Sequence, residues 1–139
     1  MDRPRFHLAF PVRDLAEARA FYGGLLGCPE GRSAADWVDF DFHGHQIVAH
    51  LSPDGAGGAG ASFVDGEAVP DRHFGLILNL ADWRALARRL KGASVRFLIE
   101  PRTRFAGRPG EQATMFLTDP SGNALEFKAF ADGAQVFAK

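Results

Sequence analysis

The feature that most constrains this chain is an approximate internal repeat. The segment from Phe6 to Phe10 alternates its side chains as a strand does, and it leads into an apolar stripe with helical spacing. The same succession recurs from His73 onward, so that both halves are predicted to read strand, helix and three strands. His7 opens one copy and His73 the other, 66 residues apart. Duplication of a half-domain is the simplest explanation.

Local signals set the limits of the predicted elements. Asp14 and Glu17 form a capping box before the first helix, which Gly27 ends, and Gly92 is expected to end the second helix in the same way. Between these helices and after them, alternating apolar residues predict strands at 37–42, 46–51, 94–99, 114–117 and 124–130. The polar segment PRTRFAGRPGE is expected to be a loop between two strands of the second half.

The length and the glycine pattern indicate how the halves are organised. A chain of 139 residues fits a single domain, here built from modules at about 4–52 and 72–131 that a Gly-rich linker, 53–71, connects. Each module has one helix to cover one sheet face, so the two uncovered faces are expected to curl around a shared cavity. The predicted fold class is therefore α+β, with two βαβββ modules forming an open, cupped mixed sheet around a cavity.

Four titratable residues are predicted to point into that cavity. His7, His50, His73 and Glu126 each alternate with apolar neighbours of the kind that packs against a helix, so they lie on the opposite face. Two of them come from the first strand of a half and two from the last. The longer loop of the second half accounts for the difference between the internal spacings of 43 and 53 residues. His50 and Glu126 are therefore expected to be equivalent under the repeat.

Three imidazoles and one carboxylate in one cavity indicate a metal site. Any one of these side chains, taken alone, is better explained as a hydrogen-bonded structural residue than as a metal ligand. Together they would bury several polar groups with no evident partner, and a divalent metal ion would satisfy all of them. The conjunction therefore favours metal ligation over packing.

Composition limits the partners. The net charge is −1 and the arginines are spread along the chain, which gives no electrostatic footprint for nucleic acid. No stretch has the length of an apolar membrane span, and the first residues have no signal-peptide pattern. The single cysteine, Cys28, excludes an internal disulfide and suits a reducing compartment. A cytoplasmic protein that binds a small molecule is expected.

Two segments, FHLAFPVRDLAEARAFYGGLLG and TDPSGNALEF, closely resemble those of the vicinal oxygen chelate superfamily, and the resemblance runs from Phe6 to Phe130. This superfamily includes glyoxalase I, type I extradiol dioxygenases, and fosfomycin and bleomycin resistance proteins. The resemblance implies a divalent metal at the centre of the sheet, held by His7, His73 and Glu126. It places His50 on the strand position where glyoxalase I has a fourth ligand, a glutamate.

The implied ligand set favours one activity within the superfamily. Two histidines and one carboxylate that leave open coordination positions suit Fe(II) and oxygen chemistry, with Mn, Zn and Ni as alternative metals. The resemblance is therefore greatest to small extradiol-type dioxygenases, which open a catecholic ring with O2 and which work as homodimers. His50 would be the catalytic proton shuttle. Phe116 stands where two-domain extradiol enzymes have a tyrosine, which loosens the substrate assignment.

Two other functions stay open. A glyoxalase-like isomerase or a thiol transferase could use the same metal site, although the isomerase would have Glu126 as its only glutamate. A dimeric drug-sequestering protein of the bleomycin-resistance kind would need no metal. Such proteins do not keep the whole ligand set, so the presence of His7, His73 and Glu126 together argues against this function.

Overall fold

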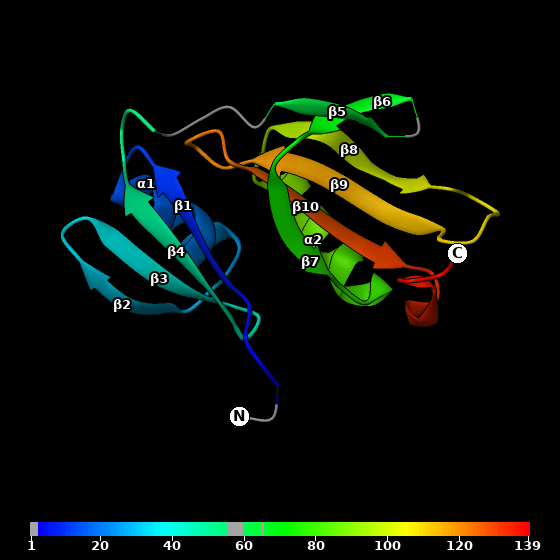
Figure 1. Cartoon of the computed structure of the whole chain (residues 1–139), viewed down its shortest axis with the longest axis horizontal. Coiled ribbons are helices and arrows are strands. Elements are labelled where there is room, and N and C mark those ends of the chain that lie inside the picture. Colours follow the sequence, from blue (N-terminus) through cyan, green and yellow to red (C-terminus); the bar gives the residue numbers. More distant parts are fainter. Residues whose placement is uncertain (1–2, 56–59, 65) are drawn as a thin grey trace. The chain divides into compact units, whose positions relative to one another are not determined.

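The computed structural model describes residues 3–55, 60–64 and 66–139, without the side chains of 61–63 (Figure 1). The chain divides into two compact units. The first comprises Met1–Gly58 and Asp119–Asn123, and the second comprises Ala59–Thr118 and Ala124–Lys139.

The first unit contains a mixed four-stranded sheet. Along the chain it has β1 (His7–Val12), the short helix α1 (Leu15–Ala18) continued by the π-helical segment η1 (Arg19–Leu25), β2 (Glu30–Ala34), β3 (Trp37–Phe42) and β4 (His45–Leu51). The strand order is β1-β4-β3-β2, with β1 parallel to β4 and the other pairs antiparallel.

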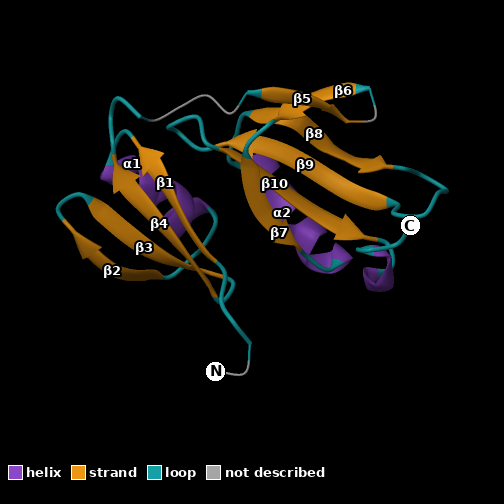
Figure 2. Cartoon of the chain, in the orientation of Figure 1, coloured by secondary structure: helices purple, strands orange, loops and turns teal. Residues whose placement is uncertain are grey.

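The second unit repeats this topology. A hairpin of β5 (Ala61–Val64) and β6 (Glu67–Pro70) precedes β7 (His73–Ile77), helix α2 (Leu80–Gly92), β8 (Phe97–Arg104), β9 (Gln112–Thr118) and β10 (Ala124–Phe130), and the short 3-10 helix η2 (Gly133–Gln135) follows. The sheet order is β7-β10-β9-β8, with β7 parallel to β10 (Figure 2). The prediction of two βαβββ modules in an α+β fold is confirmed.

The helix ends agree with the sequence only in part. The Asp14 side chain accepts the Glu17 backbone N–H at 2.8 Å, as a capping residue should, but the Glu17 carboxylate pairs with Arg13 instead of completing the box. Gly27 has a φ of +72° and ends the first helical segment as predicted. Gly92 does not play this part, since it lies inside α2 and Ser94 adopts the left-handed conformation instead.

Two segments differ from the sequence-based expectation. The stretch predicted as a linker contains the β5–β6 hairpin, although four of its glycine and alanine residues, 56–59, and Asp65 lie outside the described residues. Strand β8 starts at Phe97, later than predicted, and runs to Arg104 into the expected polar loop. The C-terminal part of this strand was not predicted because it is rich in polar residues. Several of its side chains are exposed to solvent although its backbone pairs with β9.

The second sheet separates an apolar face from a polar one. α2 packs against β10, where the Trp83 indole N–H donates to the Phe127 carbonyl oxygen at 2.8 Å. The helix side carries the buried Met115, Leu117, Leu125 and Phe127. Because side chains alternate, the neighbouring positions of β9 and β10 point to the opposite face. That face therefore carries Thr114, Phe116, Glu126 and Lys128.

Tyr22 is the centre of the first unit's core. Its ring lies 5.2 Å from that of Phe10 and 5.6 Å from that of Phe40, and the side chain is completely buried. Its hydroxyl donates to Asp119 Oδ2 at 2.8 Å. Asp119 begins the β9–β10 turn, 119–123, which belongs to this unit although the strands on either side of it do not. Asn123 also ties the turn to β1, through the carbonyl of Pro11.

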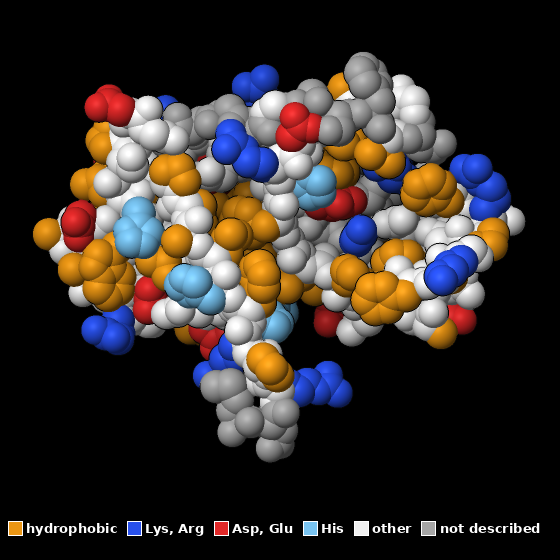
Figure 3. All heavy atoms as spheres, viewed as in Figure 1, with side chains coloured by type: hydrophobic (Ala, Val, Ile, Leu, Met, Phe, Trp, Pro, Cys, Tyr) orange, Lys and Arg blue, Asp and Glu red, His pale blue; other side chains and the backbone are white. Residues whose placement is uncertain are grey.

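Some apolar side chains stay on the surface. Phe6, Ile77 and Leu98 are each more than 40% exposed, and apolar atoms spread over the face seen in Figure 3. Of the helices that the structure describes, none is long and apolar enough to cross a membrane.

Candidate metal centre

His73 and Glu126 form a close pair on the face of the second sheet that points away from α2. The strands β7 and β10 are parallel neighbours, with His73 opposite Ala124 and Glu126 two residues further along β10. The His73 Nε2 lies 3.3 Å from Glu126 Oε1, and the two side chains keep 29% and 12% of their surface exposed. The predicted convergence of these two residues is therefore found within one unit.

Neighbouring groups orient both side chains. The His73 Nδ1 lies 2.8 Å from the Pro70 carbonyl oxygen, which can only accept, so Nδ1 carries the proton and Nε2 points at Glu126. The Thr114 hydroxyl donates to Glu126 Oε2 at 2.6 Å, which leaves Oε1 toward the histidine. The edge-to-face contact of Phe116 with the His73 ring, 5.0 Å between centroids, fixes the ring plane. This is the outer-shell arrangement usual around metal-binding histidines and carboxylates.

The pair shifts its own titration. The hydrogen bond to Glu126 raises the pKa of His73 above its ordinary value of 6.5, against the opposing effect of burial. Burial acts to raise the pKa of Glu126, but hydrogen bonds from His73 and Thr114 outweigh it and hold this pKa below 4.5. In the metal-free protein near neutral pH, Glu126 is therefore an anion, and its charge favours a proton or another cation between Oε1 and the His73 ring.

Gly75 makes the pair possible. It lies opposite Glu126 in the β7–β10 ladder, and a Cβ at this position would overlap the Glu126 carbonyl oxygen. Only glycine therefore lets the two strands approach at the point where Glu126 is held.

His7 is oriented in the same way in the first unit. Its Nδ1 lies 2.7 Å from the side-chain oxygen of Gln46, an acceptor, so the ring proton is on Nδ1 and Nε2 is left as an acceptor. The Gln46 amide in turn donates to Asp39 Oδ2 at 2.9 Å. His7 and His73 each begin the first strand of their sheet, and in both the Nδ1 is hydrogen-bonded, which leaves Nε2 as the possible ligand atom.

His50 does not occupy the position that the repeat predicted. His7 pairs with Gln46 and His73 with Ala124, so the residue equivalent to Glu126 is Val48, and His50 corresponds to Lys128. His50 lies on the expected face but is paired with Pro11, about 13 Å along the strand from the position beside His7. The expected equivalence of His50 and Glu126 is wrong by two residues, because loop lengths alone do not fix a pairing register.

The chemistry of the His73–Glu126 pair fits a divalent metal ion. Two ligands on one ion, with bonds of about 2.1 Å, lie about 3.0 Å apart in octahedral and about 3.4 Å apart in tetrahedral geometry. The observed separation of 3.3 Å falls in this range. Within either unit, the described residues contain no group of three or more His, Cys, Asp or Glu side chains that could hold a metal.

Comparison with known proteins gives the family. The model of the Glyoxalase/Bleomycin resistance protein/Dioxygenase superfamily matches residues 6–127. The chain belongs to this superfamily. A glyoxalase/bleomycin resistance protein/dioxygenase from Alicyclobacillus acidocaldarius is similar at 35% identity, with 98% of this chain and 99% of that chain covered and a TM-score of 0.80.

More distant members share the fold. The fosfomycin resistance protein FosX from Listeria monocytogenes is 17% identical, with 97% and 98% of the two chains covered and a TM-score of 0.71. A lactoylglutathione lyase from Agrobacterium tumefaciens is 17% identical, with 98% and 97% covered and a TM-score of 0.68. The search among curated proteins gave no match. The superfamily thus includes enzymes of several kinds.

Three site residues were not identified from the sequence, although it contains signals for two of them. Gly75 interrupts an otherwise apolar strand, which is a sign of close backbone approach. Thr114 is a hydroxyl residue two positions before Phe116 and so lies on the same face as Glu126. The third, Gln46, lies in the last strand of the first module, and nothing in the sequence shows that it would bind His7.

Proposed function

We propose that the protein is a metal-dependent enzyme in which His7, His73 and Glu126 hold a divalent ion, and that it opens a small dihydroxy aromatic ring as an extradiol-type dioxygenase. The observation that carries this proposal is the oriented His73–Glu126 pair, whose facing atoms lie 3.3 Å apart. His7 supports it, since its Nδ1 is hydrogen-bonded and its Nε2 is left as an acceptor in the same manner.

A bound ion, Fe(II) in the preferred case, would supply the Lewis acidity and redox capacity that ring opening with O2 requires. Groups of the chain itself would position the metal ligands and the substrate. The Pro70 carbonyl and the Thr114 hydroxyl hold His73 and Glu126 in ligand geometry. Phe116, beside His73, gives an aromatic substrate a ring to pack against.

The repeat argues against an isomerase that uses two glutamates. Such an enzyme would need a second carboxylate at the position equivalent to Glu126, which the register assigns to Val48. The first module therefore offers an apolar side chain where the second offers a base. This favours the two-histidine, one-carboxylate pattern.

A second candidate is a transferase or hydrolase that acts on an anionic substrate such as a phosphonate. Lys128 lies two residues after Glu126, on the same face, and Arg104 shares this face through the pairings of Gln112. Arg104 is 5% exposed as a residue, and its guanidinium donates to the Val64 carbonyl and has a buried Nε with no partner. No carboxylate of the described residues forms an ion pair with Arg104, so its positive charge is available to bind the acid group of a substrate.

The test begins with the metal. The protein is purified without oxygen, its metal content is measured, and catechols are then added under O2 while the ring-opened product is followed in the visible spectrum. About one iron per chain and a coloured product are expected. The His7→Ala variant should lose the metal, whereas His43→Asn, which removes a turn histidine outside the proposed ligand set, should keep it.

Two other outcomes would contradict parts of this proposal. Bound metal without turnover of any catechol contradicts the dioxygenase, and a fosfomycin-type phosphonate then becomes the substrate to assay, with and without a thiol. Absence of metal from the wild-type protein, even after anaerobic loading with Fe(II), Mn(II), Zn(II) and Ni(II), contradicts the metal site. We also propose a cytoplasmic homodimer, which sedimentation and cell fractionation would check.

A further inference from the structure

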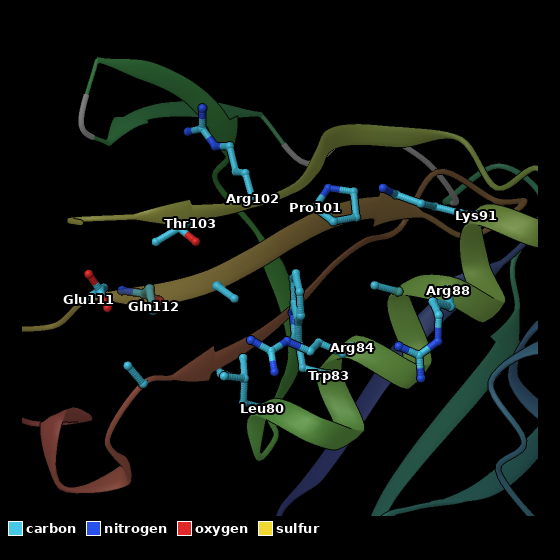
Figure 4. A pocket seen from close by; sticks show the side chains of 14 residues that line it. Leu80, Trp83, Arg84, Arg88, Lys91, Pro101, Arg102, Thr103, Glu111 and Gln112 are labelled. Carbon is cyan, nitrogen blue, oxygen red and sulfur yellow. The ribbon is translucent and has the colours of Figure 1, made fainter. Parts of the chain in front are cut away.

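The second unit has a groove on its helix side, on the sheet face opposite to His73 and Glu126. It lies between α2 and the strands β8, β9 and β10, and it has a volume of about 470 Å³ (Figure 4). Its walls include Leu80 and Trp83 of the helix, and Pro101, Ala113 and Ala129 of the sheet. This volume is in the range of small-molecule sites, and small side chains on the sheet leave room for an apolar body.

A stripe of cations borders the groove. Arg84, Arg88 and Lys91 stand four and three residues apart on α2, so they lie on one side of the helix, and all three line the groove (Figure 4). Two charged residues on the opposite side of the groove already have partners: Arg102 of β8 points away from α2 and pairs with Glu67, and the Glu111 carboxylate, just before β9, accepts the Gly107 backbone N–H (Figure 4). Within the described part of the chain, no carboxylate forms an ion pair with Arg84, Arg88 or Lys91.

Helix stability does not explain the whole stripe. Like charges three and four residues apart disfavour a helix, and of the three cations only Lys91 lies in the last turn, where the helix dipole favours a cation. The concentration of positive charge also contrasts with the net charge of −1 for the whole chain. A groove with an apolar floor and an unpaired cationic edge is complementary to a small molecule with an apolar body and an acid group.

We propose that this groove binds a small amphipathic carboxylate, with its acid group at Arg84, Arg88 and Lys91 and its apolar body against Trp83, Ala113 and Ala129. The site is separate from the His73–Glu126 pair, and it does not depend on the proposed enzymatic function. A ligand of this kind would bind in the absence of metal. Its affinity would fall as the salt concentration rises, because the cations are exposed.

Octanoate is the probe for the test, with 1-octanol as its uncharged counterpart, and the protein is the full chain in a metal chelator. Trp83 reports binding through its indole N–H signal, which Trp37→Phe assigns, since the chain has two tryptophans. Saturable binding of octanoate that shifts the Trp83 signal is expected, with octanol at least about tenfold weaker.

Two variants and a control localise the site. The double variant R84E/R88E should weaken octanoate at least about tenfold, and Ala113→Phe should weaken it by filling the floor. Arg96→Glu, an exposed arginine outside the groove, should leave binding unchanged.

Four results would overturn the proposal. The first is that octanol binds as tightly as octanoate, and the second is that octanoate binds without moving the Trp83 signal. The third is that R84E/R88E leaves octanoate binding unchanged, and the fourth is that sedimentation shows a second copy of the chain covering the groove, which R84E/R88E releases. Circular dichroism and the melting temperature confirm that each variant is folded before its binding is interpreted.

Discussion

The two units have the same strand order but differ at the site. In each, a histidine begins the first strand and donates its Nδ1 proton to an oxygen, yet only the second unit places a carboxylate beside that histidine. The equivalent of Glu126 is Val48, a buried apolar residue. The duplicated scaffold thus preserves the orientation of the histidines, while the chemistry on the neighbouring strand has diverged.

The helices differ as well. α2 is a regular helix of 13 residues, whereas the first unit has four α-helical residues followed by a π-helical segment of seven. The wider turn carries Phe21 and Tyr22, both buried, and Tyr22 reaches the β9–β10 turn. The irregular helix therefore carries the residue, Tyr22, through which the first unit binds the β9–β10 turn from the second half of the sequence.

Glu126→Gln should break the comparison most completely. The variant keeps the shape of the side chain but removes the charge that the first unit lacks, so metal affinity should fall by more than about 100-fold, beyond the effect typical of an outer-shell group. Metal content after dialysis measures this loss. Leu125 and Phe127 still pack on the helix side, so an unfolded variant would mean that Glu126 is structural.

Asp119→Ala tests what the second half supplies to the first unit. Asp119 is buried and accepts hydrogen bonds from the Tyr22 hydroxyl, the Asn123 side chain and the backbone N–H groups of Ser121 and Asn123. Its loss should lower the free energy of unfolding by about 3 kcal/mol. Urea denaturation measures this change. Asp132→Ala, at an exposed aspartate that caps η2, is the control and should cost much less.

Thr114→Val sharpens the contrast by removing only a supporting group. The hydroxyl that holds Glu126 Oε2 is lost while the side-chain volume is retained, so metal affinity should fall by about 10- to 100-fold. Titration against a competing chelator measures the affinity. An unchanged affinity would show that Thr114 does not position the carboxylate.

Alkaline pH should act on the first unit through Tyr22. Burial, ahead of the nearby Asp119 carboxylate, raises the pKa of Tyr22 well above 10.0, so its contribution to stability is present below pH 10 and is lost as the pH rises further. The free energy of unfolding should fall by up to about 1.4 kcal/mol per pH unit above 10. Because Tyr22 is the only tyrosine, absorbance at 295 nm follows its ionisation alone. Phenolate appearing at pH 10 in folded protein would refute the assignment.

His50→Gln should have the smallest effect. The pairing register separates His50 from the position beside His7, so turnover of a substrate found for the enzyme should change less than about threefold. An acid-base residue would instead lower it by about 10²- to 10⁴-fold. A loss of that size, with metal content unchanged, would restore the role predicted for His50 from sequence.

The sequence predicted those features that depend on local periodicity. The strands Trp37–Phe42 and Ala124–Phe130 begin and end where alternation indicated, and the pair His73–Glu126 follows from the same alternation. Pairing register could not be read in this way, since it depends on which residues of two distant strands meet, and His50 was misplaced for that reason. The β5–β6 hairpin escaped because glycine-rich flanks resemble a linker.

The β9–β10 turn has a consequence for how the molecule can be divided. If the gene were cut in the segment between the repeats, the N-terminal fragment would lack Asp119 and Asn123. The Tyr22 hydroxyl in the core of that fragment would then have lost Asp119 as its hydrogen-bond acceptor. The two fragments could reassemble only if the β9–β10 turn of the C-terminal fragment packed against the N-terminal fragment. The first unit thus depends on five residues that the second half of the chain supplies.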